Sequence, residues 1–351
     1  MNPRFQAESL KQFVRELFER LGADRTAAEL MGETLVAASA RGVDSHGMQL
    51  IPFYVAQIEE GRVDVRATGR VVSENGAILV YDGQNGLGQV VARTCTQHAA
   101  RLASRFGLGL AVARESNHFG AAAWWSQQMA RCGLIGMVMC NASPAVAPWQ
   151  GREPRWGTNP ISVALPGGRW LLDMATTTVA MGKIYKAHLA GQAEIPAGWA
   201  MDASGAPTTS TAAALAGLLA PLGGYKGSGL AMMVELLCGV LSGGAMSTEL
   251  GGLRIQGRPF RVSQFYLAID PGRAIGREEF DARAQHLVEQ VKSTAAAAGY
   301  DEVLVAGDPE WRAEKERLRL GIPVAAGLWR TLEETAGRLG VQVPEAVPVE
   351  G

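Results

Sequence analysis

The chain has 351 residues, of which 47% are hydrophobic, 43 are glycine and 19% are charged, and its formal net charge is −1 at pH 7. This composition excludes a disordered or coiled-coil protein and is typical of a compact α/β enzyme. The chain has no excess of positive charge and no block of lysine or arginine, so we expect neither a nucleic-acid partner nor an anionic membrane partner. The length exceeds the usual size of a single core, which favours two interleaved domains.

The cysteines and histidines argue against disulfides and bound metal. Cys95, Cys132, Cys140 and Cys238 are scattered and form no CxxC spacing, which favours a reducing, cytoplasmic setting. The five histidines show no HExxH or paired spacing, so we expect no metal site. The N-terminus lacks the apolar core of a secretion signal, and no apolar run reaches membrane length.

The first 60 residues read as helices. Apolar residues at helical spacing predict a helix over 10–21 that Gly22 ends, and a second helix begins at Asp24 or Thr26 and runs towards residue 42. Thr26 and Glu29 have the spacing of a capping box. A third helix is expected over 52–60, with proline in its first turn. The turn Ser45-His46-Gly47 therefore lies between two helices.

From residue 77 the pattern is that of alternating strands and helices. Strands are predicted over 77–81, 108–113, 134–140 and 265–269, with an antiparallel pair over 161–165 and 170–172, and helices over 89–106, 121–131, 278–298 and 327–339. Residues 186–222 have no clear period, and we expect a long surface connection there. The very apolar stretch 229–241 predicts a helix that is buried on all sides.

One polar turn follows the expected strand over 108–113. It contains Asn117, His118 and Gly120, which together offer an orienting amide, a proton carrier and a place for close backbone approach. A helix-capping role for His118 is the alternative. Similar polar or glycine-rich loops end other apolar segments, at 45–47, 157–160, 173–176 and 223–227.

Two glycine-rich turns resemble phosphate loops only loosely. Asp82–Gly88 reads GxxGxG instead of GxGxxG, and no acidic residue ends a second strand about twenty residues later, so a structural βα turn is preferred. Gly224–Gly229 is not a Walker loop, but it places Lys226 and open backbone N–H groups at a helix start, which suits an anionic ligand. There is no GxSxG motif, and Ser45 beside His46 does not by itself make a catalytic dyad.

Together and in this order, the motifs resemble the malate/L-lactate dehydrogenase family of non-Rossmann NAD(P)-dependent oxidoreductases. Its relatives include ureidoglycolate dehydrogenase, diketogulonate reductase, sulfolactate dehydrogenase and piperideine-2-carboxylate reductase. The resemblance covers nearly the whole chain and implies an α/β fold with a mixed sheet, a homodimer, and NAD or NADP as cofactor. It also implies a helical domain over 1–74, joined by C-terminal helices over about 308–345, and a cofactor-binding domain over 75–307.

The resemblance assigns roles to individual residues. His118, His46 and Ser45 are the expected catalytic group, because hydride addition to C=O or C=N leaves a charge that a proton from imidazole neutralises. Substrate contacts are expected at Leu50, Tyr54, Thr158, Asn159 and Lys183, although Lys183 could instead be a solvated lysine. Cofactor contacts are expected at His118, Phe119, Gly120, Ala121, Asp173, Met174, Ala175, Gly224, Tyr225, Lys226, Gly307 and Asp308.

Two positions depart from the family pattern. Leu50 stands where relatives usually have the arginine that clamps a substrate carboxylate, so the sequence predicts a substrate that depends less on such a clamp. Ala306-Gly307-Asp308 replaces the usual Pro-Gly-Glu near the cofactor.

Three functions therefore compete. The first is hydride transfer to or from a 2-oxo acid or related ketone, and the second is reduction of a cyclic imine. The third is a cofactor-binding homologue without catalysis, against which the presence of both His46 and His118 counts.

Overall fold

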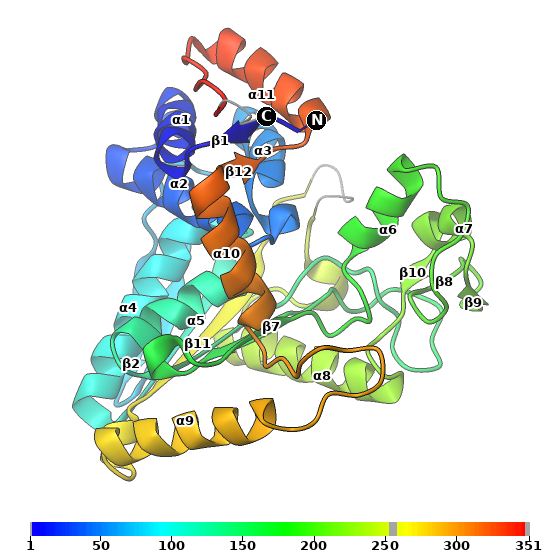
Figure 1. Cartoon of the computed structure of the whole chain (residues 1–351). Coiled ribbons are helices and arrows are strands. Elements are labelled where there is room, and N and C mark those ends of the chain that lie inside the picture. The colour runs from blue at the N-terminus through cyan, green and yellow to red at the C-terminus, as the bar shows by residue number, and fades with distance from the viewer. Residues whose placement is uncertain (1, 253–257, 348–351) are drawn as a thin grey trace.

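The computed structural model describes residues 2–252 and 258–347, and its centre is a seven-stranded mixed sheet (Figure 1). Only β3 and β4 are parallel, and every other neighbouring pair in the sheet is antiparallel. This confirms the predicted mixed, non-Rossmann sheet. In spatial order the strands are β2 (Arg70–Asn75), β3 (Ile78–Asp82), β4 (Leu108–Ser116), β11 (Val262–Ile269), β5 (Ile135–Cys140), β6 (Ile161–Ala164) and β7 (Leu171–Met174).

Helices cover both faces of this sheet. Because successive side chains of a strand point to opposite faces, Ala111 and Ala113 pack in the core with α4 (Gly88–Phe106) and α5 (Ala122–Arg131). Val112 instead packs with α8 (Tyr225–Glu235) and the π-helical turn Leu236–Val240 that continues it. The predicted bounds of β3 and α4 agree with the structure to within one residue, whereas β4 runs three residues beyond its predicted end at residue 113.

Elements from both ends of the chain pack together in one helical assembly. It comprises α1 (Ala7–Arg20), α2 (Arg25–Ala40), α3 (Ile51–Glu59) and α11 (Ala326–Leu339), with β1 (Arg4–Phe5) paired to β12 (Ile322–Pro323). The ring of Trp329 in α11 lies 4.0 Å from that of Phe5, and both termini lie beside α11 in Figure 1. The buried residues of this assembly and those beneath α4 form one continuous core. The domain boundary near residue 74 stays a prediction.

Details at the helix ends differ from expectation. Asp24, not Thr26, caps α2, because its side chain accepts the backbone N–H of Ala27 at 2.8 Å. The chain-end helices are α9 (Arg277–Lys292), shorter than predicted, α10 (Asp308–Leu320) and α11.

Short 3₁₀ turns occur at η1 (Asp44–His46), η2 (Met48–Leu50), η3 (Pro166–Gly168), η5 (Ser247–Glu249) and η6 (Pro271–Arg273). No helix within 2–252 and 258–347 is long and apolar enough to cross a membrane.

Two predictions of local structure were wrong. The expected surface connection over 186–222 forms a small lobe, seen at the right of Figure 1, with its own buried core. The elements in it are too short to show a period, and they are α6 (Met181–Leu189), β8 (Ala200–Met201), β9 (Pro207–Thr208), α7 (Thr211–Ala216) and β10 (Leu218–Leu219). The helix over 229–241 is not buried on all sides, because Met232, Leu236 and Val240 are each about half exposed along one side of it.

One glycine sets the distance between α4 and the turn that carries His118. Gly88 is the first residue of α4, and a Cβ atom there would overlap the carbonyl oxygens of Asn117 and His118. The absence of a side chain therefore lets the start of α4 lie directly against this turn.

Replacing Gly88 by alanine tests this close approach. We expect Gly88→Ala to lower the free energy of unfolding by about 1–3 kcal/mol, because the new methyl group displaces backbone. Gly337→Ala in α11 is the matched control, since its Cβ would meet nothing within 4 Å, and it should raise stability by roughly 0.5–1 kcal/mol. Urea unfolding of both variants gives the two values. Equal stability of Gly88→Ala and the wild type would contradict the packing argument.

Candidate active site

Two imidazoles that are far apart in the sequence face each other. His46 ends η1, and His118 lies in the turn between β4 and α5. Their ring centroids are 5.7 Å apart with an angle of 30° between the planes. The Ser45 hydroxyl oxygen lies 3.0 Å from Nδ1 of His46. The structure thus brings the three predicted catalytic residues together, while their catalytic role stays a prediction.

The amide of Asn117 positions the turn that carries His118. Its Nδ2 donates to the carbonyl oxygens of Asn85 at 3.0 Å and Gly86 at 2.8 Å, which ties the β3–α4 turn to the end of β4. Nε2 of Gln264 donates to the Asn117 carbonyl at 3.1 Å. Asn117 therefore orients backbone on both sides of the site.

The glycine-rich turn after β3 is structural, as the sequence indicated. The backbone N–H groups of Gly83, Asn85 and Gly86 donate to the carbonyl oxygens of Arg114, Glu115 and Gly83, respectively. The N–H of Gln84 donates to the carboxylate of Asp82. These four N–H groups are therefore all used within the protein, which leaves none of them to bind a phosphate.

Tyr54 and Gln89 form a buried chain behind His118. The Tyr54 hydroxyl lies 2.6 Å from Nδ1 of His118, and Nε2 of Gln89 donates to that hydroxyl at 2.9 Å. Tyr54 is only 3% exposed, so its hydroxyl contacts the imidazole, and its predicted contact with substrate stays untested. Gln89 was not among the predicted site residues. Its position directly after the turn Gly86-Leu87-Gly88 is the feature of the sequence that could have identified it as a site residue.

Both imidazoles are held neutral at physiological pH. Burial lowers the pKa of His118 to about 3, and repulsion from His46 adds to this effect. Burial also lowers the pKa of His46 and raises that of Tyr54. Each imidazole nevertheless keeps part of its surface open to solvent. A small molecule can therefore meet a neutral ring at this site.

Asp173 provides a carboxylate beside the same turn. It lies on β7, and its Oδ2 accepts the N–H of Ala123 in the first turn of α5 at 2.9 Å. Burial raises its pKa to about 6, although the Ala123 N–H and the charge of Arg41 oppose the shift. The side chain keeps contact with solvent, so a ligand can reach it.

Three further predicted segments meet around these groups. Gly182 at the start of α6 lies beside Ser45, since a Cβ there would be 3.7 Å from that of Ser45. The Leu222 N–H donates to the carbonyl of Thr176 at 3.0 Å, which brings the loop before α8 to the loop after β7. The Leu171 N–H donates to the carbonyl of Ala306 at 3.0 Å, which attaches the segment before α10.

The predicted substrate residues have different surroundings. Leu50 ends η2, one helical turn before Tyr54, and packs half-buried against the main core. Lys183 in α6 is exposed, with its Nζ 6.0 Å from the ring centroid of Trp199. Thr158 accepts the Thr176 N–H through its carbonyl. Contact of these residues with substrate stays a prediction.

Asn159 is fully buried and bound within the protein. Its Nδ2 donates to the carbonyl of Ala231 at 3.0 Å and to the carboxylate of Glu235 at 3.1 Å, and its Oδ1 accepts the N–H of Ala142. Both amide hydrogens are therefore used, which assigns the side chain to holding the turn before β6 against α8. Its predicted contact with substrate is untested.

The predicted cofactor residues fall into exposed and enclosed groups. Tyr225 and Lys226 are exposed in the first turn of α8, and Met174 and Ala175 follow Asp173 half-buried. Phe119 is enclosed with its ring stacked on that of Trp125, and Gly120 has a φ of +79° just before Ala121 and α5. Gly307 packs against Trp311. The Asp308 carboxylate accepts from Lys292 at 2.9 Å and from the Val305 N–H at 3.0 Å.

These residues fit a nicotinamide dinucleotide. In the first turn of α8 the exposed Lys226 can bind a pyrophosphate, and Asp173 can accept hydrogen bonds from hydroxyl groups. The neutral ring of His118 leaves an uncharged surface for the nicotinamide.

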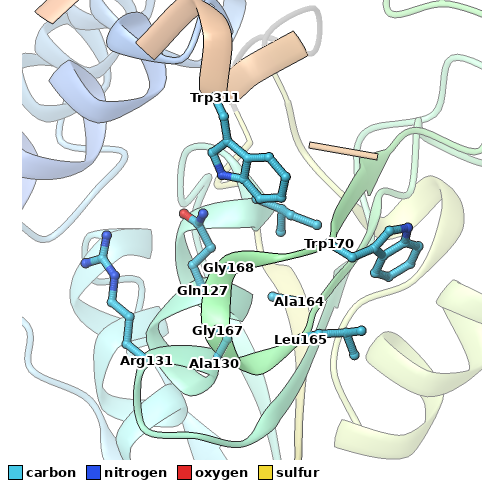
Figure 2. A pocket seen from close by; sticks show the side chains of 10 residues that line it. Gln127, Ala130, Arg131, Ala164, Leu165, Gly167, Gly168, Trp170 and Trp311 are labelled. Atoms are coloured by element: carbon cyan, nitrogen blue, oxygen red, sulfur yellow. The ribbon is translucent and has the colours of Figure 1, made fainter. Parts of the chain in front are cut away.

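A separate cavity lies at the other end of α5. It has a volume of about 330 Å³ and is bounded by α5, η3, β7 and α10. In Figure 2, Trp311 extends from α10 at the top of the cavity, Gln127 and Arg131 of α5 lie at the left, and Trp170 lies at the right. None of the predicted catalytic residues lines it, so it is distinct from the imidazole site.

Comparison with known proteins decides the family. The family model described as malate/L-lactate dehydrogenase matches residues 5–333. The chain belongs to this family. A malate dehydrogenase of Pyrococcus horikoshii is 36% identical over 349 residues, which span 97% of this chain and 96% of that protein. The family comprises NAD(P)-dependent dehydrogenases, and the protein is an oxidoreductase.

Solved structures of this dehydrogenase family confirm the fold. The structure of sulfolactate dehydrogenase from Methanocaldococcus jannaschii superposes with a TM-score of 0.91 at 33% identity, over 97% of this chain and 98% of that one. The structure of Δ1-piperideine-2-carboxylate reductase from Pseudomonas syringae pvar. tomato has a TM-score of 0.85 at 31% identity, over 95% and 99% of the two chains.

Because the pKa of Asp173 is raised, we expect the affinity for the cofactor to depend on pH. Above pH 6 the carboxylate is ionised and accepts hydrogen bonds, and below pH 6 it becomes protonated. We expect the Kd for NADH or NADPH to rise as the pH falls through about 6, and Asp173→Asn to bind roughly tenfold more weakly at pH 8 with no such step. Nicotinamide fluorescence titrations from pH 5 to 8 measure this, with Glu333→Gln on the exposed side of α11 as control. The same step in Asp173→Asn would assign the titration to another group.

Proposed function

We propose that the protein transfers a hydride between NAD(P)H and the carbonyl carbon of a 2-oxo acid or related ketone, interconverting it with the 2-hydroxy compound. The supporting observation is the pair of neutral imidazoles, His46 and His118, whose rings face each other with centroids 5.7 Å apart. Reduction leaves negative charge on the substrate oxygen, and an imidazole N–H at that position stabilises the charge. When this proton passes to the oxygen, the other ring nitrogen, Nδ1, takes the proton of the Tyr54 hydroxyl 2.6 Å away, and solvent restores the Tyr54 proton afterwards.

The residues of this chain have separable roles in that reaction. The bound nicotinamide supplies or accepts the hydride. His118 faces the reacting carbonyl oxygen, Tyr54 fixes its ring, and His46 with Ser45 closes the opposite side of the substrate. Asp173 and the first turn of α8 with Lys226 hold the cofactor. Both NAD and NADP remain candidates.

Position 50 favours a substrate that is not a simple dicarboxylate. Leu50 and Tyr54 are four residues apart along η2 and α3, so they lie on one side of this segment, with Tyr54 reaching His118. An apolar side chain at position 50 leaves a substrate carboxylate without the guanidinium partner that relatives are expected to offer. We propose that the part of the substrate beside Leu50 is uncharged.

Cofactor binding and turnover test the proposal together. We expect saturable binding of NADH or NADPH to the purified protein, and turnover with at least one 2-oxo acid or ketone. His118→Gln should keep cofactor binding but lower kcat by roughly a hundredfold or more, because the proton donor is lost. Fluorescence titration and nicotinamide absorbance measure the two quantities. Undiminished turnover by His118→Gln would contradict the assigned role, and failure to bind either cofactor would contradict the function.

The role of Leu50 is tested by restoring the arginine. We expect Leu50→Arg to raise kcat/KM for oxaloacetate relative to an uncharged 2-oxo acid analogue of similar size by roughly 10- to 100-fold, since a charged hydrogen bond contributes about 1.5–3 kcal/mol. Leu50→Met is the control of similar length and should leave the ratio unchanged. An unchanged ratio in Leu50→Arg would show that position 50 does not contact the substrate.

Reduction of a cyclic imine is the second candidate. The structural similarity to a solved piperideine-carboxylate reductase favours it, and the same imidazole could stabilise a developing amide nitrogen. Assays of a cyclic imine and the matching ketone with the same cofactor separate the two reactions.

We also propose that the protein is a cytoplasmic homodimer. The half-exposed side chains of Met232, Leu236, Val240 and Leu241 form an apolar strip along α8 and its π-helical turn. Strips of this kind are typical of protein interfaces. Sedimentation velocity of the purified chain distinguishes the dimer from a monomer.

A further inference from the structure

Two hydrogen bonds converge on one nitrogen of His118. The backbone N–H of Gly120 lies 3.2 Å from Nδ1, and the Tyr54 hydroxyl lies 2.6 Å from the same atom. Behind Tyr54, Nε2 of Gln89 lies 2.9 Å from the hydroxyl oxygen. Gln89 is fully buried, and Tyr54 nearly so.

One arrangement of donors and acceptors agrees with these contacts. A backbone N–H can only donate, so the 3.2 Å contact with Gly120 favours an Nδ1 that carries no proton. Tyr54 must then donate its single hydroxyl hydrogen to Nδ1 to keep the 2.6 Å contact favourable. Its oxygen is left as an acceptor, which matches the amide hydrogens of Gln89. In this arrangement the Gln89 amide directs Nε2 to the hydroxyl, and its Oε1 is buried without a hydrogen-bond partner among the described residues.

We propose that Gln89, acting through Tyr54, holds His118 as the neutral tautomer whose proton is on Nε2. Gln89 and Tyr54 are then positioning residues, and Gly120 assists them through its backbone. The tautomer itself follows from the hydrogen bonds alone. Its use in the reaction rests on the proposed function, because it presents an N–H donor to the carbonyl oxygen on which charge develops.

The surroundings of His118 agree with a neutral ring. A second proton on Nδ1 would point at the Gly120 N–H and the Tyr54 hydroxyl hydrogen, two groups that already donate. The neighbouring titratable side chains are Tyr54 and His46, and within 2–252 and 258–347 no carboxylate forms an ion pair with His118. Imidazolium therefore lacks a stabilising partner.

Reversing the chain of hydrogen bonds tests the proposal. Gln89→Glu keeps the shape of the side chain but replaces its donor with a carboxylate acceptor, so Tyr54 donates to Glu and can only accept from His118. We expect ¹⁵N correlation spectra of histidine-labelled wild type at pH 7 to show the Nε2–H tautomer of His118. In Gln89→Glu the spectra should shift towards Nδ1–H. The spectrum of His118→Gln identifies the signals.

The variants have matched controls. Gln290→Glu on the exposed side of α9 adds the same charge and should leave the His118 signals unchanged. Tyr54→Phe removes only the hydroxyl and should weaken the preference for Nε2–H, which keeps the proposal testable if Gln89→Glu does not fold. An Nδ1–H tautomer or an imidazolium in the wild type would overturn the proposal, as would an unchanged His118 spectrum in both variants.

Kinetic measurements test the proposed function, whereas the spectra test the tautomer alone. With an active substrate, Gln89→Glu and Tyr54→Phe should lower kcat by roughly a hundredfold while the Kd of the cofactor stays near that of the wild type, because only the proton donor is misplaced. The spectra need neither cofactor nor substrate. A correct tautomer in a protein that binds no NAD(P)H would therefore reject the proposed function and leave the tautomer assignment standing.

Discussion

The hydrogen bond between Tyr54 and His118 joins the two main parts of the molecule at the point where chemistry is expected. Tyr54 belongs to the helical assembly, His118 to the loop that follows β4, and Gln89 to the crossover helix α4. Gly88 lets that helix approach closely enough for Gln89 to reach Tyr54. Since Tyr54 is buried and its hydroxyl has two partners, a shift of α3 relative to α4 would break the contact. The position of the imidazole thus depends on the packing of three separate elements.

The site combines low charge at its centre with charge at its margins. Burial keeps His46 and His118 neutral, with repulsion from His46 adding to the effect at His118, and Leu50 adds an apolar surface one turn from Tyr54. Asp173 on β7 and Lys226 in the first turn of α8 are both in contact with solvent. This distribution suits a reaction in which charge appears only in the transition state, because neutral donors stabilise the developing oxyanion more than the uncharged carbonyl that precedes it.

The sequence predicted the parts of this structure that depend on local pattern. Helices such as α1 and α4 have a clear apolar period, and the strands beside them are continuous apolar runs, so their bounds were close. The lobe over 186–222 was missed because two-residue strands and alanine-rich turns carry no period. The apolar residues of α8 could not reveal that Met232 and Leu236 face outwards. The motif around His118 identified the family, but the partnership with Tyr54 and Gln89 arises only in the folded chain.

A crystal structure of the protein with bound NADH or NADPH tests the central claim most directly. We expect the nicotinamide ring beside His118, with Asp173 and the first turn of α8 in contact with the rest of the cofactor. The distance between the nicotinamide C4 atom and Nε2 of His118 should leave room for one carbonyl group. A cofactor bound on the Asp82–Gly88 turn, or in the cavity beneath Trp311, would show that His118 is not the acid/base of this reaction.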